Sequence, residues 1–393
     1  MDDQQLIEKT ARQVVETHDP HSTPPRDFLG AVYDAGLAWV HFPIGLGGLE
    51  VSRGLQARAD EVLQGAGGPS AFSLNPIGQG MAAPTVLEHA QPGLAAELLR
   101  PLATTEHIWC QLFSEPGAGS DLAGLATSAV QDGVGWVVNG QKVWTSLAQR
   151  ARYALLLART DPEQPKHKGL TYFVLDMHAA GVETRPLRQM TGQAEFNEVY
   201  LSDARIPDSH RLGAVGNGWR VAMTTLMNER SAIGSGSSVR GAGAIADAVE
   251  LWARRPDLRT AVLRDKLAAL WTRAEAQRLT SARAGRAATS GSPGPEGSIA
   301  KLVSAELNQH VYEFCMELLG PEATLYGSYE LRDLERDEDY RGPGQQRFLR
   351  SRANTIEGGT SEVLRNILGE RILGLPGDLR ADSGKAWKDI PRG

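Results

Sequence analysis

Cysteine is scarce in this sequence, and long apolar runs are missing from it. Cys110 and Cys315 are the only two cysteines among 393 residues, and both have apolar neighbours. Two thiols are too few for a metal site built from thiolates, and the apolar surroundings favour two separate buried thiols over a disulfide. No apolar run approaches the ~20 residues that a membrane-spanning helix needs. The sequence therefore predicts neither a thiolate metal centre nor a transmembrane span.

An excess of positive charge is also missing. The chain has 41 lysine and arginine residues against 47 aspartate and glutamate residues, which gives a net charge of −6. Without a basic excess there is no electrostatic reason to expect nucleic acid as a partner. The opening residues, MDDQQLIEKTARQ, are acidic and polar, unlike a secretory signal, which is basic and then apolar. We expect a soluble cytoplasmic protein of two or three domains.

Helical patterns dominate the first part of the chain. Apolar residues at Phe28, Leu29, Val32, Leu37 and Val40 predict a helix over 27–40. The pattern stops at HFPIGLGGLEVS, where a proline and several glycines favour irregular backbone. A second helix is expected over 92–100.

Strand patterns replace helical ones between residues 108 and 213. The apolar run at 108–112 predicts a buried strand, and further strands are expected at 153–157, 170–175 and 198–201. Asn139-Gly140 separates the short runs 136–138 and 142–144, and this dipeptide is well suited to a type I′ turn. We therefore predict a tight hairpin centred on residues 139–140.

Helical patterns return after Gly218 and continue to about residue 373. The stretch TSGSPGPEGS at 289–298 is expected to connect two helices, and the polar residues after Leu375 are expected to be loosely ordered. Two apolar stripes predict packed helices, one through Val262, Leu263, Leu267, Leu270, Trp271 and Ala274, the other through Val303, Leu307, Val311, Phe314 and Leu318.

The most informative stretch is FSEPGAGSDLAG at 113–124, directly after the predicted strand 108–112. Gly117 and Gly119 remove side chains where a planar ligand could lie against bare backbone. Ser114, Ser120 and the free amides of such a loop can donate hydrogen bonds to ligand oxygens and ring nitrogens. The stretch matches neither G-x-G-x-x-G nor the P-loop. The residues alone leave two alternatives, a ligand-binding loop or an ordinary glycine-rich turn.

This stretch resembles the flavin-binding signature of the acyl-CoA dehydrogenases, and other matches follow in the family's order. They are the loop at 43–48, KVWTS at 142–146, NER at 228–230 and TIEGGTSEVLRNILGERILGLP at 355–376. The resemblance implies a mainly α fold with a central β domain. It places an N-terminal helical domain at 1–106, a middle β-barrel or sandwich domain at 107–214, a C-terminal four-helix bundle at 215–378 and a tail at 379–393.

The resemblance also implies FAD as cofactor, an acyl-CoA as substrate and no metal. Trp144 is implied beside the flavin ring and Ser146 near its N5 atom; on their own, the two residues read as a core tryptophan and a strand-end hydroxyl. Ser120, Arg230 and Gly358 are implied at the substrate. The full set of implied cofactor contacts is Gln111, Phe113, Ser114, Gly119, Ser120, Trp144, Thr145, Ser146, Thr360 and Glu362.

The family reaction is α,β-desaturation, in which a carboxylate removes the α-proton while the β-hydrogen leaves as hydride to the flavin. The base is expected to be a glutamate whose pKa is raised by a dry pocket. Many members carry that Glu immediately before Gly-Thr, where this chain has Gly358, with Glu357 one residue early. Other members carry it on a bundle helix before an arginine, as at Glu229-Arg230. We prefer Glu229, with Glu357 as the first alternative and no competent base in this chain as the second. A surface charge pair would be the default for an isolated glutamate.

The far end of the cofactor is less defined by the sequence. The family's Arg-x-x-Phe-Gly run is missing from 252–259, and Leu319-Gly320-Pro321 stands where Phe-Gly-Gly is usual. The candidates for holding the FAD pyrophosphate are Arg254, Arg255, Arg259 and Arg264, each of which could equally be a surface charge.

Three functions stay open at the level of sequence. The first is an acyl-CoA dehydrogenase acting on branched or bulky acyl chains, with electron-transfer flavoprotein as acceptor and a homodimer or homotetramer as assembly. The second is a non-catalytic structural subunit of a mixed tetramer. The third is an oxidase-like flavoenzyme that passes electrons to oxygen.

Overall fold

The computed structural model describes residues 2–234, 239–288, 296–325, 344–377, 379 and 382–391. These residues belong to two compact units. The first unit comprises 1–186, 196–229 and 380–393, and the second comprises 187–195 and 230–379. Within the described ranges, no helix is long and apolar enough to cross a bilayer, and no cluster of His, Cys, Asp and Glu could hold a metal ion.

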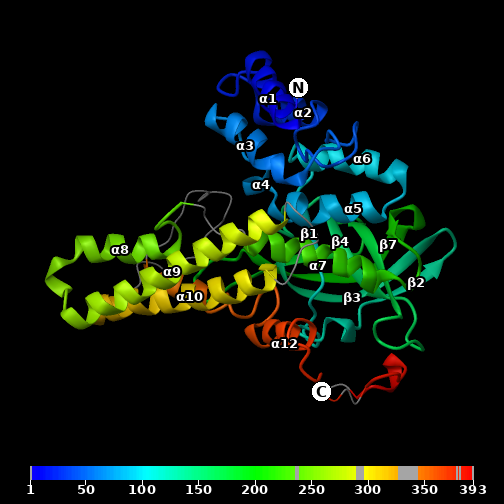
Figure 1. The fold of residues 1–393 in the computed structure, drawn as a ribbon. Coiled ribbons are helices and arrows are strands. Elements are labelled where there is room, and N and C mark those ends of the chain that lie inside the picture. Colours follow the sequence, from blue (N-terminus) through cyan, green and yellow to red (C-terminus); the bar gives the residue numbers. More distant parts are fainter. Residues whose placement is uncertain are drawn as a thin grey trace. The chain divides into compact units, whose positions relative to one another are not determined.

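The first unit begins with helices that pack on one another and on a β-sheet (Figure 1). The helix expected over 27–40 ends early, at Asp34, because Gly36 adopts a φ of +76° that interrupts the helix. Leu37 and Val40 are still buried, but they reach the core from an irregular loop. The helix expected over 92–100 is confirmed. The helices are α1 (Asp3–Thr17), α2 (Pro25–Asp34), α3 (Gln56–Gly65), α4 (Ala71–Leu74), α5 (Ala83–His89) and α6 (Pro92–Ala103).

The sheet of the first unit has the strand order β6-β7-β3-β2-β4-β5-β8, with β1 paired to β4 in parallel. Side chains of β4 and β5 are buried on both faces of the sheet, which explains why these two strands are mostly apolar. The strands are β1 (Trp109–Leu112), β2 (Ser128–Asp132), β3 (Gly135–Ser146), β4 (Tyr153–Arg159), β5 (Leu170–Asp176), β6 (Val182–Leu187), β7 (Phe196–Pro207) and β8 (Arg211–Leu212).

The predicted hairpin at 139–140 is wrong. Strand β3 runs unbroken through both residues, and its pairing with β7 shifts register between Val138 and Gly140. Gly140 therefore sits at a bulge, and a Cβ there would lie 2.4 Å from the Thr127 hydroxyl. The actual hairpin joins β2 to β3, where Asp132 pairs with Gly135 across a two-residue turn at Gly133, whose φ is +62°.

The second unit is helical. Helices α8, α9 and α10 lie side by side and bury Ile245, Leu270, Val311 and Phe314 between them (Figure 1). Of the first predicted stripe, Val262 is 64% exposed, whereas Leu263, Leu267 and Leu270 pack into this core. The helices are α7 (Gly218–Gly234), which begins in the first unit, then α8 (Ala244–Arg254), α9 (Ala261–Ala288), α10 (Glu296–Leu319), α11 (Gly344–Ser351) and α12 (Ser361–Arg371).

Two further expectations concern the loop at 289–298 and the tail. Helices α9 and α10 flank the loop, and its residues 289–295 lie outside the described residues. The tail expectation is wrong for residues 382–391, which lie against the β domain and bury Trp387. Both cysteines are buried and free, as predicted.

Candidate active site

The glycine-rich stretch leaves strand β1 as a tight turn. Glu115 and Ala118 exchange two backbone hydrogen bonds, of 3.0 and 3.1 Å, and so close the four-residue turn. Phe113 is buried and meets the ring of Tyr172 edge-on, with 5.8 Å between the ring centroids. A Cβ built on Gly117 or Gly119 would meet nothing within 4 Å. The loop is thus anchored at its start and leaves open space over its glycines.

A buried ion pair ties this loop to strand β3. The Lys142 ammonium, which is fully buried, donates to Glu115 Oε1 at 2.8 Å and to the carbonyls of Phe113 and Leu157, each at 3.0 Å. The Glu115 carboxylate also accepts hydrogen bonds from the amides of Ala126 (2.7 Å) and Thr127 (2.9 Å). One charge pair therefore fixes both ends of the glycine-rich loop against the strand that carries KVWTS.

Burial and pairing act in opposite directions on these two groups. Burial alone would raise the pKa of Glu115, but the charge of Lys142 and the hydrogen bonds to the carboxylate outweigh it and lower that pKa. Burial lowers the pKa of Lys142, and Glu115 opposes this. Glu115 is therefore held as a carboxylate at neutral pH, since its folded pKa lies below its usual value of 4.5.

Trp144 is held in an unusual conformation at the end of β3. Its φ is +60°, which is rare for a large side chain, and its indole is 58% exposed. The pairing of β3 with β7 is interrupted between Lys142 and Thr145, so the indole projects from a bulge and meets Phe196 edge-on. Backbone strain that exposes an aromatic face is typical of a binding position.

Glu229 lies near β1 in the same unit. It is half-buried on α7, and Gln111 Nε2 of β1 is 3.5 Å from its Oε2 atom, a long contact. Beneath the two, the Tyr172 hydroxyl bonds to Thr225 Oγ1 at 2.8 Å, and Thr225 bonds to Thr85 at 2.9 Å. Burial, with a contribution from the charge of Glu229, raises the pKa of Tyr172, so the phenol stays neutral. The structure therefore brings one carboxylate to the strand that leads into the glycine-rich loop.

Unpartnered polar atoms in this region fit a ligand with hydrogen-bonding ring edges. Gln111 Oε1 and Thr145 Oγ1 are buried, and neither has a partner among the described residues. Buried polar atoms are almost always satisfied, so these two atoms need an explanation. Gln111 lies on the strand that leads into the glycine-rich loop, and Thr145 directly follows Trp144. A planar group such as the isoalloxazine of FAD offers both the aromatic face and the polar edges that these residues lack.

The remaining flavin candidates of the first unit have structural contacts of their own. The Ser114 carbonyl accepts from the Val143 amide at 2.9 Å, and the Thr145 carbonyl accepts from Asn197 at 3.0 Å. Ser146 pairs with Phe196 at the end of β3, while Gly119 and Ser120 are exposed in the loop.

The alternative base, Glu357, lies in the second unit, and its carboxylate oxygens accept hydrogen bonds from Arg350 and Asn354. Arg350 donates to both of its oxygens, at 3.1 and 2.9 Å, and Asn354 donates to one of them at 2.7 Å. Arg350 also pairs with Glu195. A carboxylate whose two oxygens are occupied by a guanidinium and an amide fits a structural role better than that of a base.

The other candidates of the second unit surround the start of α12. Gly358 has a φ of +62°, and Thr360 caps α12 by accepting from the Val363 amide at 3.1 Å. Glu362 is exposed in the first turn, and the side chain of Arg230 lies outside the described residues. Lys301 of α10, which is almost fully buried, donates to the Gly359 carbonyl at 2.6 Å and so fixes the turn before the helix.

The four arginines proposed for the pyrophosphate all have neighbours in the second unit. Arg254 pairs with Glu250 and Arg264 with Asp265. Arg255 bonds to nearby Asp257 and to the distant Glu322. Arg259 bonds to the carbonyls of Trp252 and Ala253. None is singled out by its contacts, so the pyrophosphate assignment stays a prediction.

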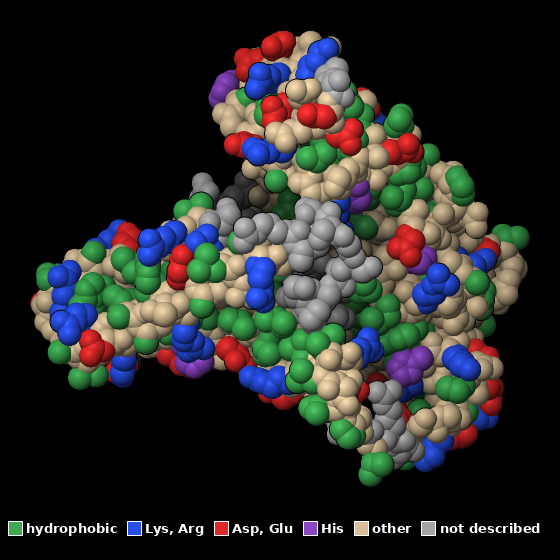
Figure 2. Space-filling view, viewed as in Figure 1, with side chains coloured by type: hydrophobic (Ala, Val, Ile, Leu, Met, Phe, Trp, Pro, Cys, Tyr) green, Lys and Arg blue, Asp and Glu red, His purple; other side chains and the backbone are tan. Residues whose placement is uncertain are grey.

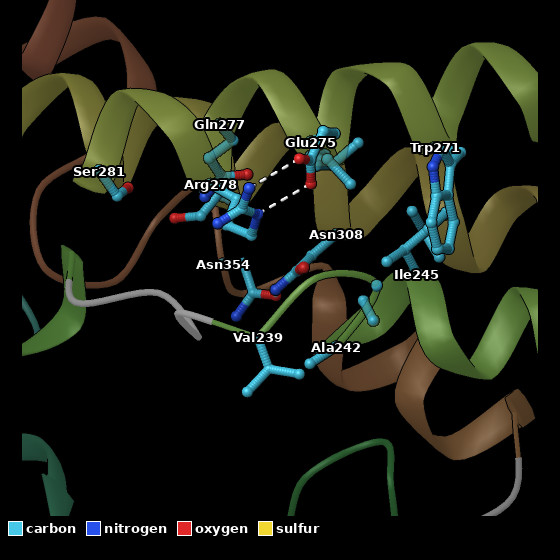
Figure 3. Close-up of a pocket in the computed structure, with 18 of the residues that line it drawn as sticks. Val239, Ala242, Ile245, Trp271, Glu275, Gln277, Arg278, Ser281, Asn308 and Asn354 are labelled. Atoms are coloured by element: carbon cyan, nitrogen blue, oxygen red, sulfur yellow. Dashed lines mark hydrogen bonds and ion pairs between the residues drawn. The ribbon is translucent and has the colours of Figure 1, made fainter. Parts of the chain in front are cut away.

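The second unit also encloses a cavity of about 310 Å³ between the start of α8, α9 and α10. Figure 3 shows the Glu275–Arg278 ion pair on one side, Trp271 and Ile245 on another, and Asn354 on a third. The lining thus combines apolar surface with charged and amide groups. No local sequence pattern indicates this cavity, because its lining comes from distant segments of the chain.

Sequence reasoning also missed the Glu115–Lys142 pair and the Tyr172–Thr225–Thr85 chain of hydroxyls. The first left a signal, since both residues fall inside stretches already singled out as motifs. The second left none, because its three members are far apart in sequence and are ordinary residue types for a strand or helix.

The comparisons with known proteins agree on one family. The family profile "Acyl-CoA dehydrogenase, middle domain" matches residues 110–204, and "Acyl-CoA dehydrogenase, C-terminal domain" matches residues 216–373. Acyl-CoA dehydrogenase FadE34 of Mycobacterium tuberculosis is 42% identical over 75% of this chain, which spans only 39% of that protein. Acyl-CoA dehydrogenase IpdE1 of the same organism is 37% identical over 87% of this chain and 86% of its own length.

Two solved structures resemble the whole chain. The "Tcur3481-Tcur3483 steroid ACAD" has a TM-score of 0.72 at 26% identity and covers 94% of this chain and 93% of its own. The "ChsE4-ChsE5 complex from Mycobacterium tuberculosis" has a TM-score of 0.71 at 28% identity and covers 96% of this chain and 99% of its own.

Proposed function

The chain belongs to the acyl-CoA dehydrogenase family of flavoprotein oxidoreductases, and we propose that it desaturates an acyl-CoA thioester between the α and β carbons. FAD supplies the acceptor for the hydride that leaves the β carbon. The α-proton passes to a carboxylate of the protein, so the two hydrogens leave as one proton and one hydride and the product is the α,β-unsaturated thioester. The observation that carries the proposal is the position of Glu229 beside Gln111, on the strand that leads into the glycine-rich loop.

In this proposal, different residues of the chain take up the proton, bound the space for the flavin and contact the thioester. Glu229 takes the proton, and Gln111 keeps the carboxylate oriented toward the loop. Trp144 and the glycines bound the flat space for the ring, while Ser120 lies at the thioester. Because the α-proton is weakly acidic, donors at the thioester oxygen have to stabilise the enolate-like charge that develops there.

The substrate is proposed to be a bulky, steroid-type acyl-CoA. This rests on the similarity to the steroid-acting enzyme named above, at 26% identity. Electron-transfer flavoprotein is proposed as the acceptor from the reduced cofactor.

The assembly is proposed to be a dimer or tetramer. Figure 2 shows apolar side chains standing among charged ones on the helices of the second unit. Several large apolar side chains of this unit are more than half exposed, and exposed apolar surface of this kind typically marks a protein interface. They are Val262, Leu279, Ile356, Ile372, Leu373 and Leu375.

The test is the visible spectrum of the purified chain and its response to substrate. We expect a bound-flavin spectrum that bleaches under anaerobic conditions when an acyl-CoA from a panel of straight-chain, branched and steroid-type thioesters is added. A chain that stays colourless after FAD is supplied would contradict the cofactor assignment. Stoichiometric peroxide formation under air would instead identify an oxidase-like enzyme.

A second candidate is a non-catalytic subunit that completes a related, active chain. Gly358 at the position where many members carry the base favours it, as does the similarity to a two-component complex. This candidate predicts that the chain alone never bleaches with any thioester, while a mixture with an active homologue does. Bleaching of the isolated chain would exclude it.

A further inference from the structure

The C-terminal segment 382–391 binds directly to the part of the chain that follows the glycine-rich loop. Trp387, which is buried, donates from its indole Nε1 to the Gly124 carbonyl at 3.1 Å. The Trp387 amide also donates to the Gln164 carbonyl at 2.9 Å, and Ala386 forms a β-bridge with Pro165. Figure 1 shows this segment, in red, beside the loops of the β domain. The segment is therefore built into the first unit and contacts the end of the FSEPGAGSDLAG stretch.

Arg159 connects the same loop to Trp387. This arginine is only 3% exposed at the end of β4, and it donates to the carbonyls of Ala123 (2.6 Å), Leu125 (3.1 Å) and Lys166 (3.3 Å). Its guanidinium lies 4.2 Å from the centroid of the Trp387 ring. The indole thus covers a buried charge whose donors fix the backbone of the loop, in a cation–π geometry.

An ion-pair bridge provides a second, independent connection. The Lys166 ammonium lies 2.9 Å from both carboxylate oxygens of Asp121 and 2.5 Å from the carboxylate of Asp382. Asp121 is the residue directly after Ser120 in the glycine-rich stretch. Lys388 adds a further pair with Glu163 at 2.6 Å. The C-terminal segment is therefore held near both of its ends. The bridge through Lys166 and the contacts of Trp387 lead back to residues 121–125, and Lys388 adds an attachment at Glu163.

We propose that residues 382–391 act as a strap that holds the glycine-rich loop in its flavin-binding shape, with Trp387 and Arg159 as positioning residues. The inference rests on the proposed function, since it takes the loop as the FAD site. Apart from the buried Ala118, the loop is exposed from Pro116 to Asp121 and has no side chains at Gly117 and Gly119 to order it. Its shape therefore depends on its two ends. Glu115 and Lys142 fix the first end. The second end is held by Arg159 and the strap at residues 123–125, together with the bonds from the Ala126 and Thr127 amides to Glu115.

A strap of this kind couples two equilibria. If docking of residues 382–391 favours the loop shape that binds FAD, FAD must favour docking by the same factor. Removing the Trp387 indole should therefore weaken FAD binding, and bound FAD should protect the strap. We expect a factor between about five and a hundred, the usual range of such couplings.

The experiment measures both directions of the coupling. FAD is titrated into the apoprotein of the wild type, Trp387→Ala, Trp387→Phe and the control Lys385→Ala, whose side chain is exposed in the same segment. Trp387→Ala should raise the Kd for FAD at least fivefold, within the range of coupling given above. Trp387→Phe should recover part of the loss, because phenylalanine can cover Arg159 but cannot donate to Gly124. Lys385→Ala should bind FAD as the wild type does.

The reciprocal measurement uses the wild type alone, so it holds even where a variant folds poorly. Carboxypeptidase digestion of the C-terminus is followed with and without FAD, and FAD should slow it by a factor similar to the change in Kd. If the wild type binds FAD but digestion is unaffected, or if Trp387→Ala binds FAD as tightly as the wild type, the strap is wrong and the proposed function stands. If the wild type binds no FAD, the proposed function is wrong. The proposal that the strap supports FAD binding is then wrong as well.

Discussion

Lys142 is a buried charge of the first unit whose removal should strongly affect stability. It is fully buried, and its ammonium is compensated by Glu115 and two backbone carbonyls. Removing one partner of such a pair leaves an uncompensated charge, which costs roughly 3–5 kcal/mol. Lys142→Met should therefore lower the free energy of unfolding at neutral pH by about that amount, measured by urea denaturation, and should release the flavin. The double variant Glu115→Gln/Lys142→Met should recover much of the stability, because no charge is left buried.

The same pair predicts how stability changes with pH. Because the folded pKa of Glu115 is lowered, the folded state binds fewer protons than the unfolded state at this group. Its contribution is fully present above the usual value of 4.5 and is lost as the pH falls through the folded pKa. In Lys142→Met, the largest cause of the lowering is gone, so the acid decline should be smaller or reversed. An identical acid profile in wild type and variant would contradict this.

The strained backbone of Trp144 predicts that its replacement has opposite effects on the stability of the apoprotein and on FAD binding. A φ of +60° costs a large residue on the order of 1–2 kcal/mol, whereas glycine adopts it freely. Trp144→Gly should therefore leave the melting temperature of the apoprotein unchanged or raised, while the Kd for FAD increases. Leu147→Gly, at a φ of +61°, is the matched control for backbone strain alone. A Trp144→Gly variant that binds FAD as the wild type does would remove Trp144 from the site.

At the scale of single residues, the sequence shows which residue types the candidate site contains, but it does not show the backbone conformations that they adopt. The glycines, Trp144 and Glu229 were all readable from their motifs. The positive φ of Trp144 and the pairing of Glu115 with Lys142 depend on how β3 pairs with its neighbours, and no local pattern encodes that. The burial of Trp387 was missed for the same reason, because its partners lie more than 200 residues earlier, with Gly124 at a separation of 263.

At the scale of elements, periodicity was most successful for strands buried on both faces. The apolar runs that became β1, β4 and β5 are continuous, so they could not be read as exposed turns. The hairpin at 139–140 was wrong because an Asn-Gly pair fits a β-bulge as well as a type I′ turn, and only the pairing with β7 distinguishes the two. Strands β2 and β6 were missed because half-exposed, charged residues interrupt their pattern.

The turn before α12 predicts that the family's usual base cannot simply be restored. Gly358 has a φ of +62°, so any L side chain there is strained by roughly 1–2 kcal/mol. Gly358→Glu should lower the stability of the chain and should not restore turnover to Glu229→Gln. Asn366→Glu, at an exposed position of α12, is the control for an added negative charge nearby. A double variant that turns over at the wild-type rate would mean that the position before Gly359 is the working one.

At the scale of the whole molecule, the order of helical, β and helical segments was predictable because each pattern extends over many residues. The oligomeric state was not predictable in this way, since it depends on which apolar side chains stay exposed after folding. We predict that the chain sediments as a dimer or larger, and that Leu373→Asp, at a side chain 72% exposed, shifts it toward the monomer. Val134→Asp, in the hairpin turn of the first unit, should leave the mass unchanged. A wild-type monomer at micromolar concentration would contradict this prediction.

The most direct test of the account is the rate of anaerobic flavin bleaching by an acyl-CoA in Glu229→Gln. Loss of a general base typically costs about a hundredfold to ten-thousandfold in rate. Glu229→Gln should therefore bind FAD and thioester normally and bleach at least about a hundred times more slowly than the wild type. Glu357→Gln, which loses part of its pairing with Arg350, should bleach within a few-fold of the wild-type rate. Wild-type bleaching in Glu229→Gln, or a loss confined to Glu357→Gln, would contradict the central claim that Glu229 is the base.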